Sequence, residues 1–247
     1  MQLLNQLIQS REQSQKWLAV LVDPDKMKTP ELLKQFIGSC EYAKVDLILV
    51  GGSLLLNDSL YECISVIKST THIPVVIFPG SPLQISDKAD AILFLSLISG
   101  RNPELLIGNH VTVAPYLKKT GIEILPTGYI LVDCGNATTV SYISNTQPIP
   151  YHKPEIAAVT ALAGEMLGLK LIYVDGGSGA QKPVSQKCLE LIKQQTSVPL
   201  ITGGGIRSLD DAQKAWNAGA DVVVVGTAFE NDPQLILSFR NRTTVSA

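Results

Sequence analysis

The sequence predicts an α/β protein built as a single (β/α)8 TIM barrel. Three observations support this prediction: short β-rich apolar runs alternate with helix-like stretches, there are about eight such runs, and no linker of disordered composition divides the chain. Alternation of this kind is typical of parallel strands joined by crossover helices. A doubly wound sheet is the alternative, but it usually needs fewer strands. We therefore expect one domain over residues 1–247.

The expected strands are short runs rich in β-branched and other apolar residues. They occupy residues 17–22, 45–50, 74–78, 91–97, 129–133, 171–175, 199–202 and 221–226. Between them, apolar residues recur at helical spacing, and Ser, Thr or Pro opens several of the stretches. Helices are expected within residues 29–43, 54–69, 155–169, 184–196 and 208–220.

Two connections depart from this pattern. Only residues 79–90 separate the third and fourth runs, so the third crossover helix is expected to be short or irregular. Residues 134–152 are rich in Ser, Thr, Asn and Pro, and they predict a long irregular loop over the barrel mouth.

Composition excludes several classes of protein. The 247 residues are 45% hydrophobic and carry a net charge of −2. Because the charges are nearly balanced, no positive electrostatic field over the whole surface attracts nucleic acid or anionic lipid. The start of the chain lacks a signal-peptide pattern, and no apolar run approaches the roughly 18 residues of a spanning helix. We expect a cytoplasmic protein for which peripheral lipid contact stays open. The scattered cysteines predict buried free thiols rather than zinc ligands: Cys40, Cys63, Cys134 and Cys188.

Glycine dominates the residues that follow the predicted strands. TGGGIRS, residues 202–208, and GTAFE, residues 226–230, end the last two strands, where barrels often bind phosphate. We expect Gly204 and Gly205, with Gly226 and Thr227, to form a phosphate cradle; a tight turn without ligand is the alternative. Arg207 could add a cation, or it could pair with a neighbouring aspartate.

Two further strand ends carry oxygen ligands. Asp23 in VDPDK is either a turn or capping aspartate or a magnesium ligand, because Mg²⁺ prefers one or two carboxylates together with water and phosphate oxygens. Ser53 in GGS ends the neighbouring strand and could approach the same ion or cap a helix. Asp25 and Lys26 are interpreted as surface turn residues.

Tyr173 and Asp175 alternate with Val174, so both are expected to point into the barrel mouth. Asp175 could accept a proton or a hydroxyl hydrogen bond, or it could serve only as a turn residue before glycine.

Taken together, VDPDK, LVGGS, YVDGGSGA, TGGGIRS and VVVGTAFE resemble the geranylgeranylglyceryl phosphate synthase family, which includes the heptaprenylglyceryl phosphate synthases. The resemblance extends over residues 17–235. It implies a (β/α)8 barrel and a Mg²⁺-dependent prenyltransferase that joins sn-glycerol 1-phosphate to a polyprenyl diphosphate, with geranylgeranyl diphosphate as the expected donor, and releases pyrophosphate. A homo-oligomer is expected by the same analogy.

The resemblance also implies roles for individual residues. Asp23 and Ser53 are the implied magnesium ligands, and Tyr173 and Asp175 are the implied catalytic residues. The implied glycerol 1-phosphate site comprises Tyr173, Val174, Asp175, Gly176, Gly177, Ser178, Gly179, Gly204, Gly205, Gly226 and Thr227. The sequence departs from the commoner YLEAGSGA pattern by having Asp175 and Gly176 where Glu and Ala are usual.

The sequence leaves open where the prenyl groove lies and which class of function the protein has. Phe78, Phe94 and the aromatic residues of the 142–151 segment are groove candidates, although Phe78 and Phe94 also suit a core. Glycine cradles also occur in sugar-phosphate isomerases and aldolases, which usually want a Lys or paired acids at strand ends. A noncatalytic phosphometabolite sensor is a further alternative, but it has no need for the Asp23 carboxylate.

Overall fold

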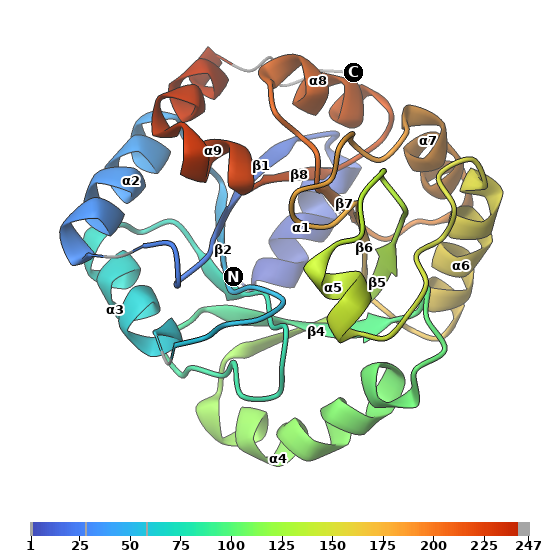
Figure 1. The fold of residues 1–247 in the computed structure, drawn as a ribbon, viewed down its shortest axis with the longest axis horizontal. Helices are drawn as coiled ribbons and strands as arrows, with labels where there is room; N and C mark the ends of the chain where they lie inside the picture. The colour runs from blue at the N-terminus through green and yellow to red at the C-terminus, as the bar shows by residue number, and fades with distance from the viewer. Residues whose placement is uncertain (1, 28, 58, 242–247) are drawn as a thin grey trace.

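Eight parallel strands pair in sequential order, and β8 pairs with β1 to close a barrel (Figure 1). This computed structural model describes residues 2–27, 29–57 and 59–241. Its strands are β1 (Trp17–Val22), β2 (Leu47–Val50), β3 (Val75–Ile77), β4 (Ala91–Leu97), β5 (Glu123–Leu131), β6 (Leu171–Asp175), β7 (Leu200–Gly203) and β8 (Val222–Val225). The barrel prediction is confirmed. Residues 1, 28, 58 and 242–247 of the expected domain lie outside the described residues.

Helices surround the strands, and polar caps begin several of them. Thr29, Ser185 and Ser208 each accept a hydrogen bond from a backbone amide of the first helical turn, as expected from Ser and Thr at these positions. The α-helices are α1 (Leu3–Glu12), α2 (Pro30–Tyr42), α3 (Leu60–Thr70), α4 (Asn109–Thr120), α5 (Thr139–Ile143), α6 (Pro154–Met166), α7 (Gln186–Gln195), α8 (Leu209–Asn217) and α9 (Thr227–Asn231). A π-helical turn, η1 (Glu104–Gly108), precedes α4, and a 3-10 segment, η2 (Pro233–Asn241), follows α9.

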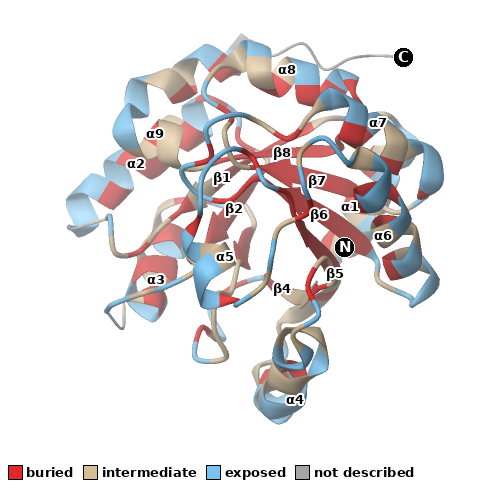
Figure 2. Cartoon of the chain, turned by 45° about the vertical axis from the view of Figure 1, so that its right-hand side comes forward, coloured by how far each residue is buried: buried red, intermediate tan, exposed pale blue. Residues whose placement is uncertain are grey.

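The buried side chains form two clusters on opposite faces of the strands. Figure 2 shows the strands at the centre of the molecule largely in the colour of buried residues. One cluster lies between the strands and the surrounding helices and includes Val174. The other fills the barrel interior and includes Leu49, Tyr129 and Tyr173. Successive side chains on a strand point to opposite faces, so Tyr173 and Val174 belong to different clusters.

The amino-terminal helix α1 lies across the end of the barrel where the strands begin, behind the ring of strands in Figure 1. Leu3 and Leu7 pack into the interior cluster, and the backbone amides of Leu3 and Leu4 donate to the Glu123 carboxylate at the start of β5. This helix was not foreseen from the sequence. It closes the barrel at the end opposite the carboxyl ends of the strands.

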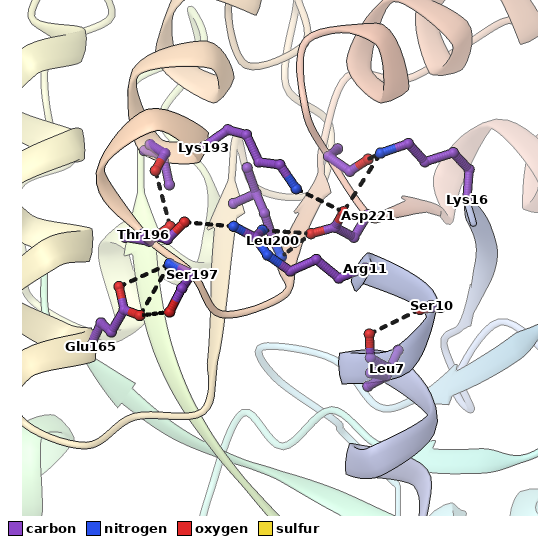
Figure 3. A network of polar contacts seen from close by, with 12 residues as sticks. Leu7, Ser10, Arg11, Lys16, Glu165, Lys193, Thr196, Ser197, Leu200 and Asp221 are labelled. Atoms are coloured by element: carbon purple, nitrogen blue, oxygen red, sulfur yellow. Dashed lines mark hydrogen bonds and ion pairs between the residues drawn. The ribbon is translucent and has the colours of Figure 1, made fainter. Parts of the chain in front are cut away.

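Asp221 holds this closed end together (Figure 3). Its side chain is 1% exposed and forms ion pairs with Arg11 at 2.9 Å, Lys16 at 3.5 Å and Lys193 at 3.3 Å. It also accepts a hydrogen bond from the Leu200 amide at 2.9 Å. A carboxylate this deeply buried requires such partners, which here join α1, α7 and the starts of β7 and β8.

The bounds of every strand except β5 lie within two residues of those expected. That strand was predicted at 129–133 but spans Glu123–Leu131. Pro126 and Gly128 obscured its pattern, since both residues are disfavoured within strands. In the barrel, Pro126 uses its carbonyl to accept from the Lys170 amide, and a Cβ on Gly128 would lie 2.9 Å from an Ile98 methyl.

Several helices also differ from the expectations. The sequence analysis assigned no helix to 98–128, because Gly108, Pro115 and β-branched residues interrupt the pattern; α4 forms there and begins with the π-helical turn. The 134–152 loop is not wholly irregular, since a capping box between Thr138 and Ser141 starts α5 within it. The third crossover helix was expected to be short or irregular, and residues 78–90 indeed contain no regular helix.

Helix α3 begins at Leu60 rather than near residue 54. The Asp25 carboxylate accounts for this difference, because it accepts hydrogen bonds from the Leu56 amide, the Asn57 side chain and the Ser59 hydroxyl. These bonds hold the segment before α3 in a non-helical loop beside the loop after β1.

All four cysteines are free and buried, as expected, and burial raises the pKa of each thiol to about 12. None of the helices in the described parts of the chain combines the length and apolar character that crossing a membrane requires.

Replacing Asp221 with Asn should destabilise the protein by about 3 kcal/mol, because three cations lose their shared buried carboxylate. Urea unfolding of the full chain measures the change. The matched control is Asp210→Asn, since Asp210 is 71% exposed in its pair with Lys214 and should leave the unfolding midpoint unchanged. Equal midpoints for both variants would contradict the stabilising role of the Asp221 network.

Candidate active site

A polar cavity of about 550 Å³ opens among the loops that follow the strands. The loops after β1, β2, β6, β7 and β8 line it, at the end of the barrel opposite α1. Carboxyl ends of parallel strands meet at one rim of a barrel, which is why residues far apart in sequence come together here. Most of the residues expected at the site line this cavity: Asp23, Ser53, Tyr173, Asp175, Gly177, Ser178, Gly179, Gly204, Gly205, Gly226 and Thr227.

Two of the expected residues do not line the cavity. The Val174 side chain points away from the barrel interior and packs among residues beneath the helices. Gly176 donates its amide to the Gly203 carbonyl and packs against the Cys134 side chain. Both residues therefore lie in the supporting structure of the site, behind its wall.

The glycine turn after β7 packs directly against the loop after β6. Gly204 and Gly205 have φ angles of +80° and +72°, in the left-handed region that favours glycine. A Cβ on Gly204 would lie 2.8 Å from the Gly177 amide nitrogen, and one on Gly205 would overlap the Lys182 carbonyl. The turn thus brings two backbone segments to the same cavity wall, and the Ser178 and Thr227 hydroxyls meet beside it at 3.2 Å.

Asp175 is a buried carboxylate at the end of β6. Its Oδ2 accepts from the Tyr129 hydroxyl at 2.6 Å, and its Oδ1 accepts from the Gly177 amide at 2.8 Å. Burial raises the pKa of Asp175 above its usual value, and the two hydrogen bonds partly offset this effect. The carboxylate is therefore held in one orientation and binds protons more readily than an exposed aspartate.

Tyr129 was missed by sequence reasoning. It lies on β5 directly beside Tyr173 in the strand register, and their ring centroids are 5.5 Å apart at right angles. Phe78 completes an aromatic group, with its ring stacked on Tyr173 at 5.1 Å. Only the alternation of side chains in GYILVD could have indicated that Tyr129 faces the interior, but Tyr129 was the first residue of the predicted strand 129–133 and its side chain was assigned to neither face.

The Asp23 carboxylate faces the polar cavity. It is 24% exposed to the cavity, its Oδ1 accepts from the Asp25 amide at 3.1 Å, and burial raises its pKa. Ser53 lines the same cavity, and Gly52, which precedes Ser53, lies close to the Asp23 carboxylate. One carboxylate, one hydroxyl and substrate phosphate oxygens suit Mg²⁺, although no cluster of three or more His, Cys, Asp or Glu forms a metal site within the described ranges.

Two basic side chains lie at the rim of this cavity. Lys26, which the sequence analysis interpreted as a surface turn residue, lines the cavity and pairs with Glu230 at 2.7 Å. Arg207 donates to the backbone carbonyls of Ala180 and Gln181. The Arg207 guanidinium therefore ties the loop after β7 to the loop after β6 and is not paired with Asp210 or Asp211, although its backbone amide donates to Asp211.

A second cavity of about 150 Å³ is mostly apolar and lies between the 79–85 segment and α4. Phe94, Leu105, Val113 and Leu117 contribute to its wall. His110 also lines it, edge-on to Phe94 with ring centroids 4.4 Å apart, and burial lowers its pKa, which favours the uncharged ring. Of the groove candidates, Phe78 and Phe94 line this cavity, whereas Tyr142 and Tyr151 do not.

The two cavities share part of their walls. Gly52, Ser53, Phe78 and Tyr129 line both of them. A long molecule with a charged head and an apolar tail could therefore lie with its head near Asp23 and its tail against α4. Its reactive centre would then lie beside the aromatic group of Phe78, Tyr129 and Tyr173.

Comparison with known proteins agrees with this geometry. The chain is 51% identical over 232 residues to a geranylgeranylglyceryl phosphate synthase of Chitinophaga pinensis, covering 94% of this chain and 92% of that one. It is 53% identical over 221 residues to the synthase of Spirosoma linguale, covering 90% and 88%. The crystal structure of (S)-3-O-geranylgeranylglyceryl phosphate synthase from Thermoplasma acidophilum with its substrate sn-glycerol-1-phosphate superposes with a TM-score of 0.91 at 34% identity, covering 100% and 99%.

The PcrB family model matches residues 9–242, which is nearly the whole chain. This match and the identity to named synthases confirm the resemblance that the strand-end motifs predicted, and the chain belongs to the PcrB family.

Proposed function

We propose that this protein transfers the geranylgeranyl group of geranylgeranyl diphosphate to a hydroxyl of sn-glycerol 1-phosphate, forming an ether and releasing pyrophosphate. The single observation that supports this most strongly is the shared wall of the polar and apolar cavities. A phosphate-binding barrel that acts on a small sugar phosphate has no need for an apolar cavity joined to its polar one, and the same is true of a glycerol phosphate sensor.

The glycine-lined part of the polar cavity is the proposed site of glycerol 1-phosphate. Backbone amides in the loops after β6 and β7, with the Ser178 and Thr227 hydroxyls, are suitable donors for phosphate oxygens. The glycerol hydroxyl then lies towards Tyr173 and Asp175, inside the mouth. Holding both substrates in this way replaces a bimolecular encounter with a reaction between fixed neighbours.

In the proposed reaction, the bond between C1 of the prenyl group and the diphosphate oxygen breaks, and the electron pair leaves with the diphosphate. The glycerol oxygen bonds to C1, and Asp175 accepts the proton from that hydroxyl. The Tyr129 hydrogen bond orients the carboxylate for this step. The aromatic faces of Phe78 and Tyr173 favour the positive charge that develops at C1.

Asp23 and Ser53 are the proposed holders of a Mg²⁺ ion, on the basis of their common cavity and the partial exposure of the carboxylate. When bound, the ion supplies neutralisation of diphosphate charge.

Exposed apolar residues near the apolar cavity support peripheral contact with lipid, from which a long donor would enter. Leu56, Leu83 and Tyr142 are 80%, 92% and 85% exposed, on the loops after β2, β3 and β5. A separate exposed stripe on α6 includes Val159 and Met166 and supports the expected homo-oligomer. We place the reaction in the cytoplasm.

Incubation of the purified protein with sn-glycerol 1-phosphate, radiolabelled geranylgeranyl diphosphate and Mg²⁺ should yield an extractable labelled ether lipid. EDTA should abolish the product if the metal assignment is correct. sn-Glycerol 3-phosphate should give none, because its hydroxyl would be presented on the wrong side. Failure with geranyl, farnesyl, geranylgeranyl and heptaprenyl diphosphates alike would reject prenyl transfer.

Removing the Tyr129 hydroxyl should change the pH dependence of the reaction. Its hydrogen bond lowers the pKa of Asp175, so Tyr129→Phe should raise that pKa and move the acid limb of kcat/KM to higher pH. Asp175→Asn should lower kcat by about 100-fold, since the amide cannot accept the proton. Rate profiles between pH 4 and 9 test both effects, where pH 4 is roughly the usual pKa of an aspartate. If the acid limb of kcat/KM is unchanged in Tyr129→Phe, Asp175 is not the group that accepts the proton.

Filling the apolar cavity should lower kcat/KM for long prenyl diphosphates more than for short ones. Val113→Trp adds bulk to the cavity wall and should lower kcat/KM for geranylgeranyl diphosphate by about tenfold while affecting geranyl diphosphate less. Val111→Trp is the matched control, because Val111 is on the same helix but 67% exposed. Equal effects of Val113→Trp on both donors would place the prenyl tail elsewhere.

A further inference from the structure

The polar cavity has an unfavourable charge balance for its proposed ligands. Among the described residues, the charged side chains that line it are three carboxylates, Asp23, Asp175 and Glu230, and two cations, Lys26 and Arg207, which leave one net negative charge. A phosphate and a diphosphate would both bind here as anions. A metal ion offsets part of this charge, and the protein must supply more.

Arg207 is already committed to the protein backbone. Its two terminal nitrogens donate to the carbonyls of Gln181 at 3.1 Å and Ala180 at 2.9 Å. Withdrawing the guanidinium towards a ligand would leave these carbonyls without their donors and release the loop after β6. Arg207 therefore contributes to ligand binding by holding the glycine cradle in shape, and its guanidinium does not contact the ligand.

Lys26, unlike Arg207, has its ion-pair partners among side chains and not on the backbone. Its side chain is 46% exposed, and its ammonium lies 2.7 Å from Glu230 Oε2 and 3.8 Å from Asp23 Oδ2. Glu230 is 6% exposed, and its other oxygen accepts from the Asp23 backbone amide at 3.2 Å. The carboxylate is thus held by the backbone, whereas the ammonium is held only by side-chain ion pairs and lies beside the candidate metal ligand.

We propose that Lys26 binds the leaving diphosphate and that Glu230 holds the lysine in a waiting position when the site is empty. This assignment rests on the proposed function, because it needs a diphosphate near Asp23. As the C1–O bond breaks, negative charge grows on the diphosphate oxygens, and the ammonium stays protonated while it moves from Glu230 to these oxygens. Glu230 therefore competes with the substrate for the same cation.

The opposing roles of the two partners give the test. Isothermal titration of the full chain with pyrophosphate and Mg²⁺ should show binding weakened about tenfold in Lys26→Met, since a charge-assisted hydrogen bond is lost. Glu230→Gln should bind pyrophosphate more tightly than the unaltered protein, because the lysine loses its nearest competing charge. The glutamine oxygen still accepts from the Asp23 amide, which preserves the local fold.

Two controls separate this role from general effects of charge and stability. Lys153→Met removes an exposed lysine at the start of α6 that does not line the polar cavity, and it should leave affinity within about twofold. Lys26→Arg should retain most of the binding. In turnover, Lys26→Met should raise KM for the prenyl diphosphate and leave KM for glycerol 1-phosphate unchanged.

The proposal is overturned if Lys26→Met binds pyrophosphate as the unaltered protein does, or if Glu230→Gln binds no more tightly. A purely structural ion pair would weaken binding in both variants, with lowered thermal midpoints. The titration contains neither prenyl donor nor glycerol phosphate. The expected affinity pattern without ether product would therefore reject the proposed function and leave only a pyrophosphate-binding role for Lys26.

Discussion

The pairing of β8 with β1 is the constraint on which the rest of the molecule depends. It extends from Trp17 opposite Val222 to Val20 opposite Val225, and it closes a sheet whose strands all run in the same direction. The amino ends therefore meet at one rim, where α1 and the buried Asp221 network close the barrel. The carboxyl ends meet at the other rim, where both cavities open. Stability and chemistry are thus separated at opposite ends of one closed sheet.

The irregular connection between β3 and β4 leaves an apolar cavity beside the polar cavity at the barrel mouth. A regular crossover helix would occupy the space beside α4, but residues 78–90 form a loop instead. Buried Gln84 fixes this loop by donating to the Gly52 carbonyl and accepting from the Gly80 amide. The apolar cavity lies between this loop and α4 and meets the polar cavity at Phe78. A missing helix therefore creates room for the proposed prenyl tail.

The sequence was sufficient to locate the rim of the site but not its internal contacts. The strand ends at Asp23, Asp175 and Gly204 follow from local apolar runs, because barrel closure brings every strand end to the same rim. The bond between Tyr129 and Asp175 depends on the register of β5 against β6, and register is set by packing across the interior. The Lys26–Glu230 pair joins residues 204 positions apart, which no local pattern encodes. Pro126 lies within β5 and Pro115 lies within α4, although proline is disfavoured in both kinds of element. Both elements were missed or misplaced because tertiary packing overrode this local preference.

Each of the two departures from the commoner YLEAGSGA pattern has a local physical reason in this chain. A Cβ at position 176 would lie 3.0 Å from the Cys134 sulfur and 3.3 Å from the Ala180 Cβ, so Gly176 relieves crowding against the loop after β5. Asp175 is short enough to accept from the Gly177 amide two residues ahead, which supports the positive φ of +83° at Gly177. A Glu carboxylate, one methylene further from the backbone, would not close this local turn in the same way. Asp175 thereby shapes the cradle with one oxygen while the other faces Tyr129. The backbone proposed to bind the phosphate is thus coupled directly to the carboxylate proposed to receive the proton.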